Sequence, residues 1–131
     1  MIVDTNVLLD VLNDDPAWVD WSVQQLRAQS QIHRLGINAV IYAELSLSFS
    51  TVEGLDAAIA DMELAMLDIS KPALFLAGKA FAQYRRRGGT KSNVLSDFFI
   101  GAHAAVTGQP ILTRDTSRYA SYFPTVRLVA P

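Results

Sequence analysis

The chain has 131 residues, of which 50% are hydrophobic and 18% charged, and its formal charge is −2. This length fits one domain, 1–131, and the composition argues against disorder. The small negative charge excludes a protein whose overall field attracts nucleic acid, so such binding must rest on local basic clusters or metal ions. The absence of cysteine excludes disulfides, thiolate metal sites and cysteine nucleophiles.

No segment predicts export or membrane insertion. The first residues lack the basic region followed by an apolar region that defines a signal peptide. No apolar run approaches the roughly 18 residues of a membrane span, and the longest, 98–106, is better explained as a buried helix. We therefore expect a cytoplasmic protein without membrane contact.

Short apolar segments alternate with helical patterns along the chain. Ile2-Val3 predicts a buried strand, Asp15 before Pro16 predicts a helix start, and Gly88-Gly89 predicts a helix end. The expected strands are 2–3, 35–37, 67–69, 111–113 and 126–129, and the expected helices are 7–12, 16–30, one capped by Asn38, 51–65, 70–87, 97–107 and 117–123. The 51–65 helix is expected to start with a capping box at Ser50-x-x-Glu53. This alternation predicts an α/β fold with a mostly parallel sheet.

Four acidic residues are expected at one edge of that sheet. Asp4 directly follows the first strand, and Asp115 follows the 111–113 strand. Asp97 lies in the first turn of the helix leading toward that strand, and Glu44 lies about two turns into a helix entered from another strand. Because ligands bind beyond the carboxyl ends of parallel strands, these positions predict a functional site.

Each acid alone also has a structural explanation. Asp4 could cap a helix, Asp97 could interact with a helix dipole, and Asp115 could belong to a turn. Glu44 has apolar neighbours that leave little room for a solvated face, so it needs a partner. Together, the carboxylates would repel one another unless a divalent cation offset their charge. Oxygen ligands without histidine or cysteine favour Mg²⁺ or Mn²⁺, which suit phosphodiester hydrolysis.

The segment Met1-Ile-Val-Asp-Thr-Asn-Val-Leu-Leu-Asp10 resembles the opening of PIN-domain toxins of the VapC type. The similarity continues through 37–44, 97–105 and 111–115, in the expected order and over essentially the whole chain. It implies a PIN-like three-layer α/β/α fold in a single domain. It also implies a metal-dependent endoribonuclease, the toxin of a toxin–antitoxin pair, that uses Mg²⁺, with Mn²⁺ as a substitute.

The resemblance also implies roles for individual residues and partners. The implied catalytic and metal-binding residues are Asp4, Glu44, Asp97 and Asp115. Asp4 and Asp97 would bind the metal directly, whereas the other two would orient waters, bind a second ion or help activate water. Asn6 and Thr113 match polar positions beside the site. The implied partners are a structured RNA (a tRNA or a ribosomal RNA loop), an antitoxin whose C-terminal tail covers the pocket, and a second copy in a homodimer.

Basic residues offer further candidates for RNA contact. Arg85-Arg86-Arg87, with Lys91 beyond them, could contact phosphates or could simply form a cationic helix end. Arg114 and Arg118 could likewise bind substrate or balance the carboxylates. We select Arg87 and Arg114, with Asn6 and Thr113, as candidate substrate-binding residues.

Other residues are expected to have structural roles. Ser96 stands where proline is common in the closest relatives, and it can act as a helix cap. His103 does not share a helix face with Asp97, so we assign it a structural role. Trp18 is assigned to packing, and Asp10 to a solvated position.

Two other functions compete with this interpretation. An aspartate-nucleophile phosphatase would need a second Asp at position 6, where this chain has Asn6. A catalytically weak PIN-fold module could bind an antitoxin or RNA without cleaving it. The presence of all four carboxylates argues against the second alternative.

Overall fold

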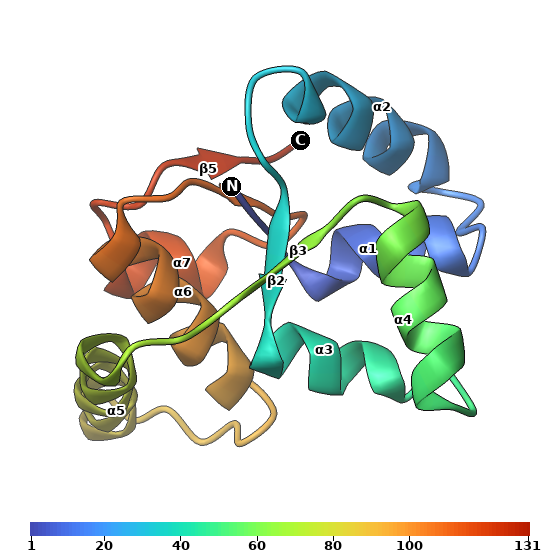
Figure 1. The fold of residues 1–131 in the computed structure, drawn as a ribbon. Coiled ribbons are helices and arrows are strands. Elements are labelled where there is room, and N and C mark those ends of the chain that lie inside the picture. The colour runs from blue at the N-terminus through green and yellow to red at the C-terminus, as the bar shows by residue number, and fades with distance from the viewer.

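Five short strands form the centre of a computed structural model that describes residues 1–131 (Figure 1). The strands are β1 (Ile2–Val3), β2 (Gly36–Asn38), β3 (Ala65–Leu67), β4 (Ile111–Leu112) and β5 (Leu128–Val129). The helices are α1 (Thr5–Leu12), α2 (Val19–Ser30), α3 (Ala39–Ser46), α4 (Val52–Asp61), α5 (Lys71–Arg86), α6 (Leu95–Thr107) and α7 (Ser117–Tyr122).

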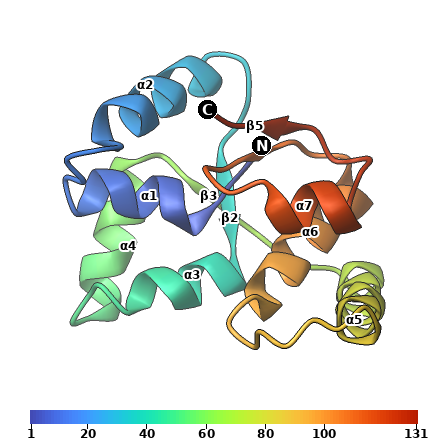
Figure 2. The same cartoon turned by 180° about the vertical axis from the view of Figure 1, so that it is seen from behind.

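The strands form one sheet in the order β3-β2-β1-β4-β5, and every neighbouring pair is parallel. Helices α1, α2 and α4 lie on one side of the sheet, and α5, α6 and α7 lie on the other (Figures 1 and 2). The predicted three-layer α/β/α fold is therefore confirmed, and the sheet is parallel throughout. No helix combines the length and the apolar character needed to cross a membrane.

The central strands are apolar because helices cover both of their faces. Ile2, Val3, Ile111 and Leu112 are fully buried. Strands covered on both sides lose the alternation of apolar and polar residues, which explains the continuous apolar runs in the sequence. The first and fourth strands pair directly, so the residues that follow them meet at one edge.

Several predicted helix ends are confirmed. The Asn38 side chain accepts hydrogen bonds from the backbone N–H groups of Val40 and Ile41 at the start of α3. Ser70 caps α5 in the same way. Gly108 ends α6 with a φ of 67°, a left-handed conformation that glycine adopts without steric cost.

Two predicted helix starts were wrong. The Asp15 carboxylate accepts bonds from Ala17 and Trp18 N–H in a turn, and α2 begins only at Val19. At the start of α4 the N-cap is Thr51 rather than the predicted Ser50. The Thr51 hydroxyl accepts a hydrogen bond from the backbone N–H of Gly54, three residues later. The predicted capping box is therefore not formed.

Other boundaries also differ from the predicted ones by two residues or more, those of α1, α4, β3, α6 and β5 among them. β3 lies at Ala65–Leu67 instead of 67–69, because its pairing with β2 sets the register. α6 begins at Leu95, two residues before the predicted start, and Asp97 lies in its first turn as predicted. The carboxylate still lies at the N-terminal end of the helix.

Candidate active site

The carboxyl edge of the sheet collects the first turns of α1, α3 and α6 (Figure 2). Asp4 joins β1 to α1 and is only 6% exposed. Its Oδ1 accepts a bond from the Thr5 N–H at 2.8 Å, and its Oδ2 accepts bonds from Thr113 Oγ1 at 2.8 Å and Tyr119 Oη at 2.9 Å. Burial raises the pKa of Asp4, although the hydroxyl bonds oppose this increase.

Glu44 of α3 is half-buried, and its carboxylate contacts the first turn of α1 and the first turn of α6. Its Oε1 accepts a bond from Thr5 Oγ1 at 2.7 Å, and its Oε2 accepts one from Ser96 Oγ at 3.2 Å. The predicted need for a partner is met by these hydroxyl groups. Ser96 is therefore not a helix cap, because its hydroxyl is directed to Glu44, and the residue before α6 has no side-chain cap.

Asp97 is the carboxyl group most affected by its neighbours. Burial, followed by the charge of Asp4, raises its pKa from 3.8 to about 7. Asp115 and Glu44 add to this effect, whereas the Arg118 guanidinium opposes it, and no hydrogen bond contributes. The structure therefore brings Asp4, Glu44 and Asp115 into electrostatic range of Asp97, which bears most of the repulsion.

Asp115 lies at the exposed rim of the same edge. The N–H and hydroxyl of Ser117 both donate to its Oδ1, at 3.1 and 2.8 Å. These bonds lower the pKa of Asp115, and the charges of Arg118 and Lys91 lower it further. Asp115 therefore remains ionised more readily than Asp4 and Asp97, whose pKa values are raised.

The two predicted polar residues lie beside Asp4. Asn6 Nδ2 donates to Thr113 Oγ1 at 3.3 Å and lies 3.5 Å from Asp4 Oδ2. The side-chain carbonyl oxygen of Asn6 accepts a hydrogen bond from the backbone N–H of Arg114 at 3.2 Å. Asn6 and Thr113 therefore link α1 to the loop after β4 and help to fix Asp4.

The Arg114 side chain is directed away from the acids. Its Nε and a terminal nitrogen donate to the Asp10 carboxylate at 2.7 and 2.9 Å, and the guanidinium lies 4.9 Å from the Trp18 ring centroid. The Ser22 hydroxyl also donates to Asp10. The prediction that Asp10 is solvated was wrong, because this residue is 2% exposed and paired. RNA contact by Arg114 stays a prediction.

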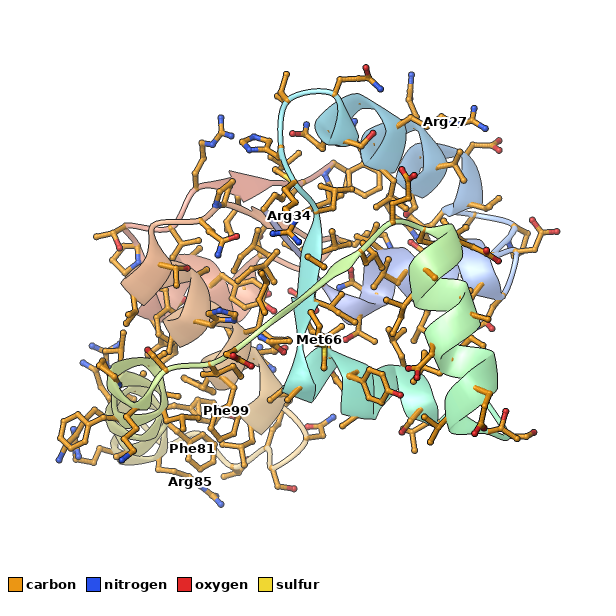
Figure 3. The ribbon with its side chains drawn as sticks, viewed as in Figure 1. Arg27, Arg34, Met66, Phe81, Arg85 and Phe99 are labelled. Carbon is orange, nitrogen blue, oxygen red and sulfur yellow. The ribbon has the colours of Figure 1, made fainter.

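The arginine cluster lies at the end of α5. Arg85 and Arg87 are exposed and lie over the rings of Phe81 and Tyr122, at 5.3 Å in each case. Figure 3 labels Phe81 and Arg85 on α5, where the ring of Phe81 packs against Phe98 of α6 with 5.4 Å between ring centroids. The exposed guanidinium of Arg87 is available for contact with a polyanion.

Two buried residues near the site have different roles. Tyr119 was not identified from the sequence, because its partner Asp4 is 115 positions away and no local pattern signals such a bond. His103 is 1% exposed, and its Nδ1 lies 3.0 Å from Asn38 Nδ2. Burial lowers the pKa of His103, which agrees with the predicted structural role.

The four acids supply a donor set that fits a hard divalent cation. All their side-chain ligand atoms are oxygens, and the raised pKa of Asp97 reflects negative charge that a cation would offset. No group of three histidine, aspartate or glutamate side chains lies close enough together to hold one metal ion. Mg²⁺ does not need three protein ligands, because it is usually held by one or two carboxylates and retains several waters.

The chain belongs to the PIN domain family, whose model matches residues 1–122. Three solved structures show the same fold. VapBC2 from Rickettsia felis, bound to a DNA fragment from its promoter, has a TM-score of 0.76 at 18% identity, covering 99% of this chain and 97% of that one. VapBC-1 from nontypeable Haemophilus influenzae has a TM-score of 0.73 at 17% identity, with 98% and 96% covered. A toxin–antitoxin complex from Klebsiella pneumoniae has a TM-score of 0.70 at 19% identity, with 98% and 94% covered. No curated protein sequence matches the chain.

Proposed function

We propose that this chain is a metal-dependent endoribonuclease that hydrolyses RNA phosphodiester bonds and acts as the toxin of a toxin–antitoxin pair. The main observation is the convergence of four carboxylates, from four separate segments, at the carboxyl edge of a PIN-domain sheet. Such a concentration of negative charge costs stability unless the site binds a cation. A site that carries this cost is better explained as catalytic than as purely structural.

Asp4 and Asp97 are the proposed direct ligands of Mg²⁺, with Mn²⁺ as a substitute. Glu44 and Asp115 orient water, bind a second ion or help activate the attacking water. When bound, the cation lowers the pKa of a coordinated water and stabilises the charge on a phosphoryl oxygen. Asp115 suits a water-orienting role because its carboxylate lies at the exposed rim.

RNA is the proposed substrate, either a tRNA or a ribosomal RNA loop. Asn6 and Thr113 lie beside Asp4, where they can fix the polar edge of the site. Lys91 and Arg118 are near enough to lower the pKa of Asp115, so positive charge flanks the acids. These cations, with the exposed Arg87, can contact phosphates although the chain carries a net negative charge.

An antitoxin and a second copy of the chain are the proposed protein partners, in the cytoplasm. The similar structures from Rickettsia felis and Klebsiella pneumoniae are a VapBC complex and a toxin–antitoxin complex, which supports an antitoxin partner. The edge strand β3 and helix α5 carry exposed apolar side chains, including Met66, Leu74 and Phe75. Such a surface supports a homodimer.

The proposed activity is tested by incubating the full chain with total bacterial RNA in Mg²⁺ or Mn²⁺ and mapping the new 5′ ends. We expect discrete cuts that disappear in EDTA and in Asp97→Asn. The control is Asp61→Asn, which replaces an exposed acid on α4 and should cut like the original protein. Cuts that persist in EDTA and in Asp97→Asn would contradict the proposal. Metal binding without any cuts would favour the alternative of a binding module.

A further inference from the structure

The two carboxylate oxygens of Asp4 have different surroundings. Oδ2 accepts bonds from two hydroxyl groups, those of Thr113 and Tyr119, and the Asn6 amide lies 3.5 Å away. Oδ1 accepts one bond, from the Thr5 N–H. Because each carboxylate oxygen has two lone pairs, the hydroxyls fill Oδ2, whereas Oδ1 keeps one lone pair free.

The hydroxyl of Tyr119 is held in place by the packing of its helix. Tyr119 is 1% exposed and belongs to α7, which lies against α6 (Figure 2). This close approach depends on Gly101 of α6, because a Cβ there would overlap the ring of Phe123, the residue that follows α7. The tyrosine hydroxyl therefore reaches Asp4 from a rigid support rather than from a mobile loop.

We infer that Tyr119 is a positioning residue that, together with Thr113, engages Oδ2 of Asp4 and leaves Oδ1 to face the divalent cation. The inference rests on the proposed function, because it requires Asp4 to bind a cation. It assigns no reacting atom to Tyr119, which acts only through the orientation of Asp4.

The consequence of removing this hydroxyl follows from the hydrogen-bond count. Tyr119→Phe retains the ring in its buried site but leaves one lone pair of Oδ2 without a donor. The carboxylate then loses one of the two bonds that fix this oxygen, so its orientation toward a cation is less defined. Loss of an outer partner of a metal ligand typically weakens metal binding about 10–100-fold.

The test is a titration of the metal-free full chain with Mn²⁺ at fixed pH, in which free Mn²⁺ is followed by electron paramagnetic resonance. We expect Tyr119→Phe to raise the Mn²⁺ dissociation constant about tenfold or more. The matched control is Tyr122→Phe on the same helix, whose ring packs against Phe98 and whose hydroxyl is not among the donors to Asp4. It should bind Mn²⁺ like the original chain. Equal affinity of Tyr119→Phe and the original chain would overturn the inference.

Thermal unfolding in EDTA shows whether each variant is folded. If Tyr119→Phe does not fold, Thr113→Ser and Thr113→Ala provide the second comparison. Serine keeps the hydroxyl bond to Oδ2 and should retain affinity, whereas alanine should weaken binding. Equal Mn²⁺ binding by these two variants would overturn the inference. Failure of the original chain to bind Mn²⁺ would overturn the proposed function as well, so the two failures are distinguishable.

Discussion

Replacing Asp97 by asparagine should stabilise the metal-free protein at neutral and alkaline pH. Burial and the charge of Asp4 raise the pKa of Asp97 from 3.8 to about 7. A carboxyl group whose pKa rises on folding favours the folded state while protonated. The stability of the original chain therefore falls as pH rises from about 4 to about 7, where the unfolded chain is ionised first, and then levels off.

The size of the effect follows from this pKa. The difference between 3.8 and about 7 corresponds to about 4 kcal/mol of unfolding free energy. Water reaches the half-buried side chain and screens its charge, so we halve this value to about 2 kcal/mol. At about 4 °C of melting temperature per kcal/mol for a chain of this size, Asp97→Asn should melt about 8 °C higher.

The assay is thermal unfolding in EDTA at about pH 4, where the effect begins, and at about pH 8, where it is fully developed. The gain of Asp97→Asn should appear at the higher pH and largely vanish at the lower. Asp61→Asn, an exposed acid outside the site, serves as the control and should show little gain at either pH. Equal gains for Asp97→Asn at both values would refute the reasoning about repulsion among the acids.

Three further substitutions probe the surrounding structure. Arg114→Met leaves the buried Asp10 without its cation and should lower the free energy of unfolding, measured in urea, by about 3 kcal/mol. An unchanged free energy of unfolding would mean that the Arg114–Asp10 pair does not stabilise the fold. Gly101→Ala forces a methyl group against Phe123 and should cost about 2 kcal/mol, whereas unchanged stability would mean that α7 can shift freely. Arg87→Ala should weaken RNA binding and reduce the slope of log affinity against log salt by about 0.7, and an unchanged slope would exclude a phosphate contact.

Local sequence patterns predict much of this fold because the patterns agree with the tertiary structure. The buried strands at Ile2-Val3 and Ile111-Leu112 have apolar side chains on both faces, and Asn38 carries its own capping chemistry. Boundaries that depend on partners were less predictable. The register of β3 comes from its pairing with β2, which no residue within β3 indicates.

The same distinction applies to the site. Asp4 and Asp115 could be placed at one edge because each follows a strand of a parallel sheet. The hydroxyl of Tyr119 and the ion pair of Asp10 with Arg114 join segments more than 100 positions apart, so composition and periodicity carry no signal of them. Sequence reasoning consequently placed the acids, Asn6 and Thr113 at this edge but gave no sign of the Tyr119 hydroxyl or of the Asp10–Arg114 pair.

The central claim is that these acids bind a divalent cation together, and Mn²⁺ anomalous scattering from crystals of the full chain tests it most directly. We predict an anomalous peak at the carboxyl edge of the sheet, within coordinating distance of Asp4 Oδ1 and Asp97. We also predict its loss in crystals of Asp97→Asn. A peak elsewhere, or an empty edge in Mn²⁺-saturated crystals of the original chain, would contradict the account.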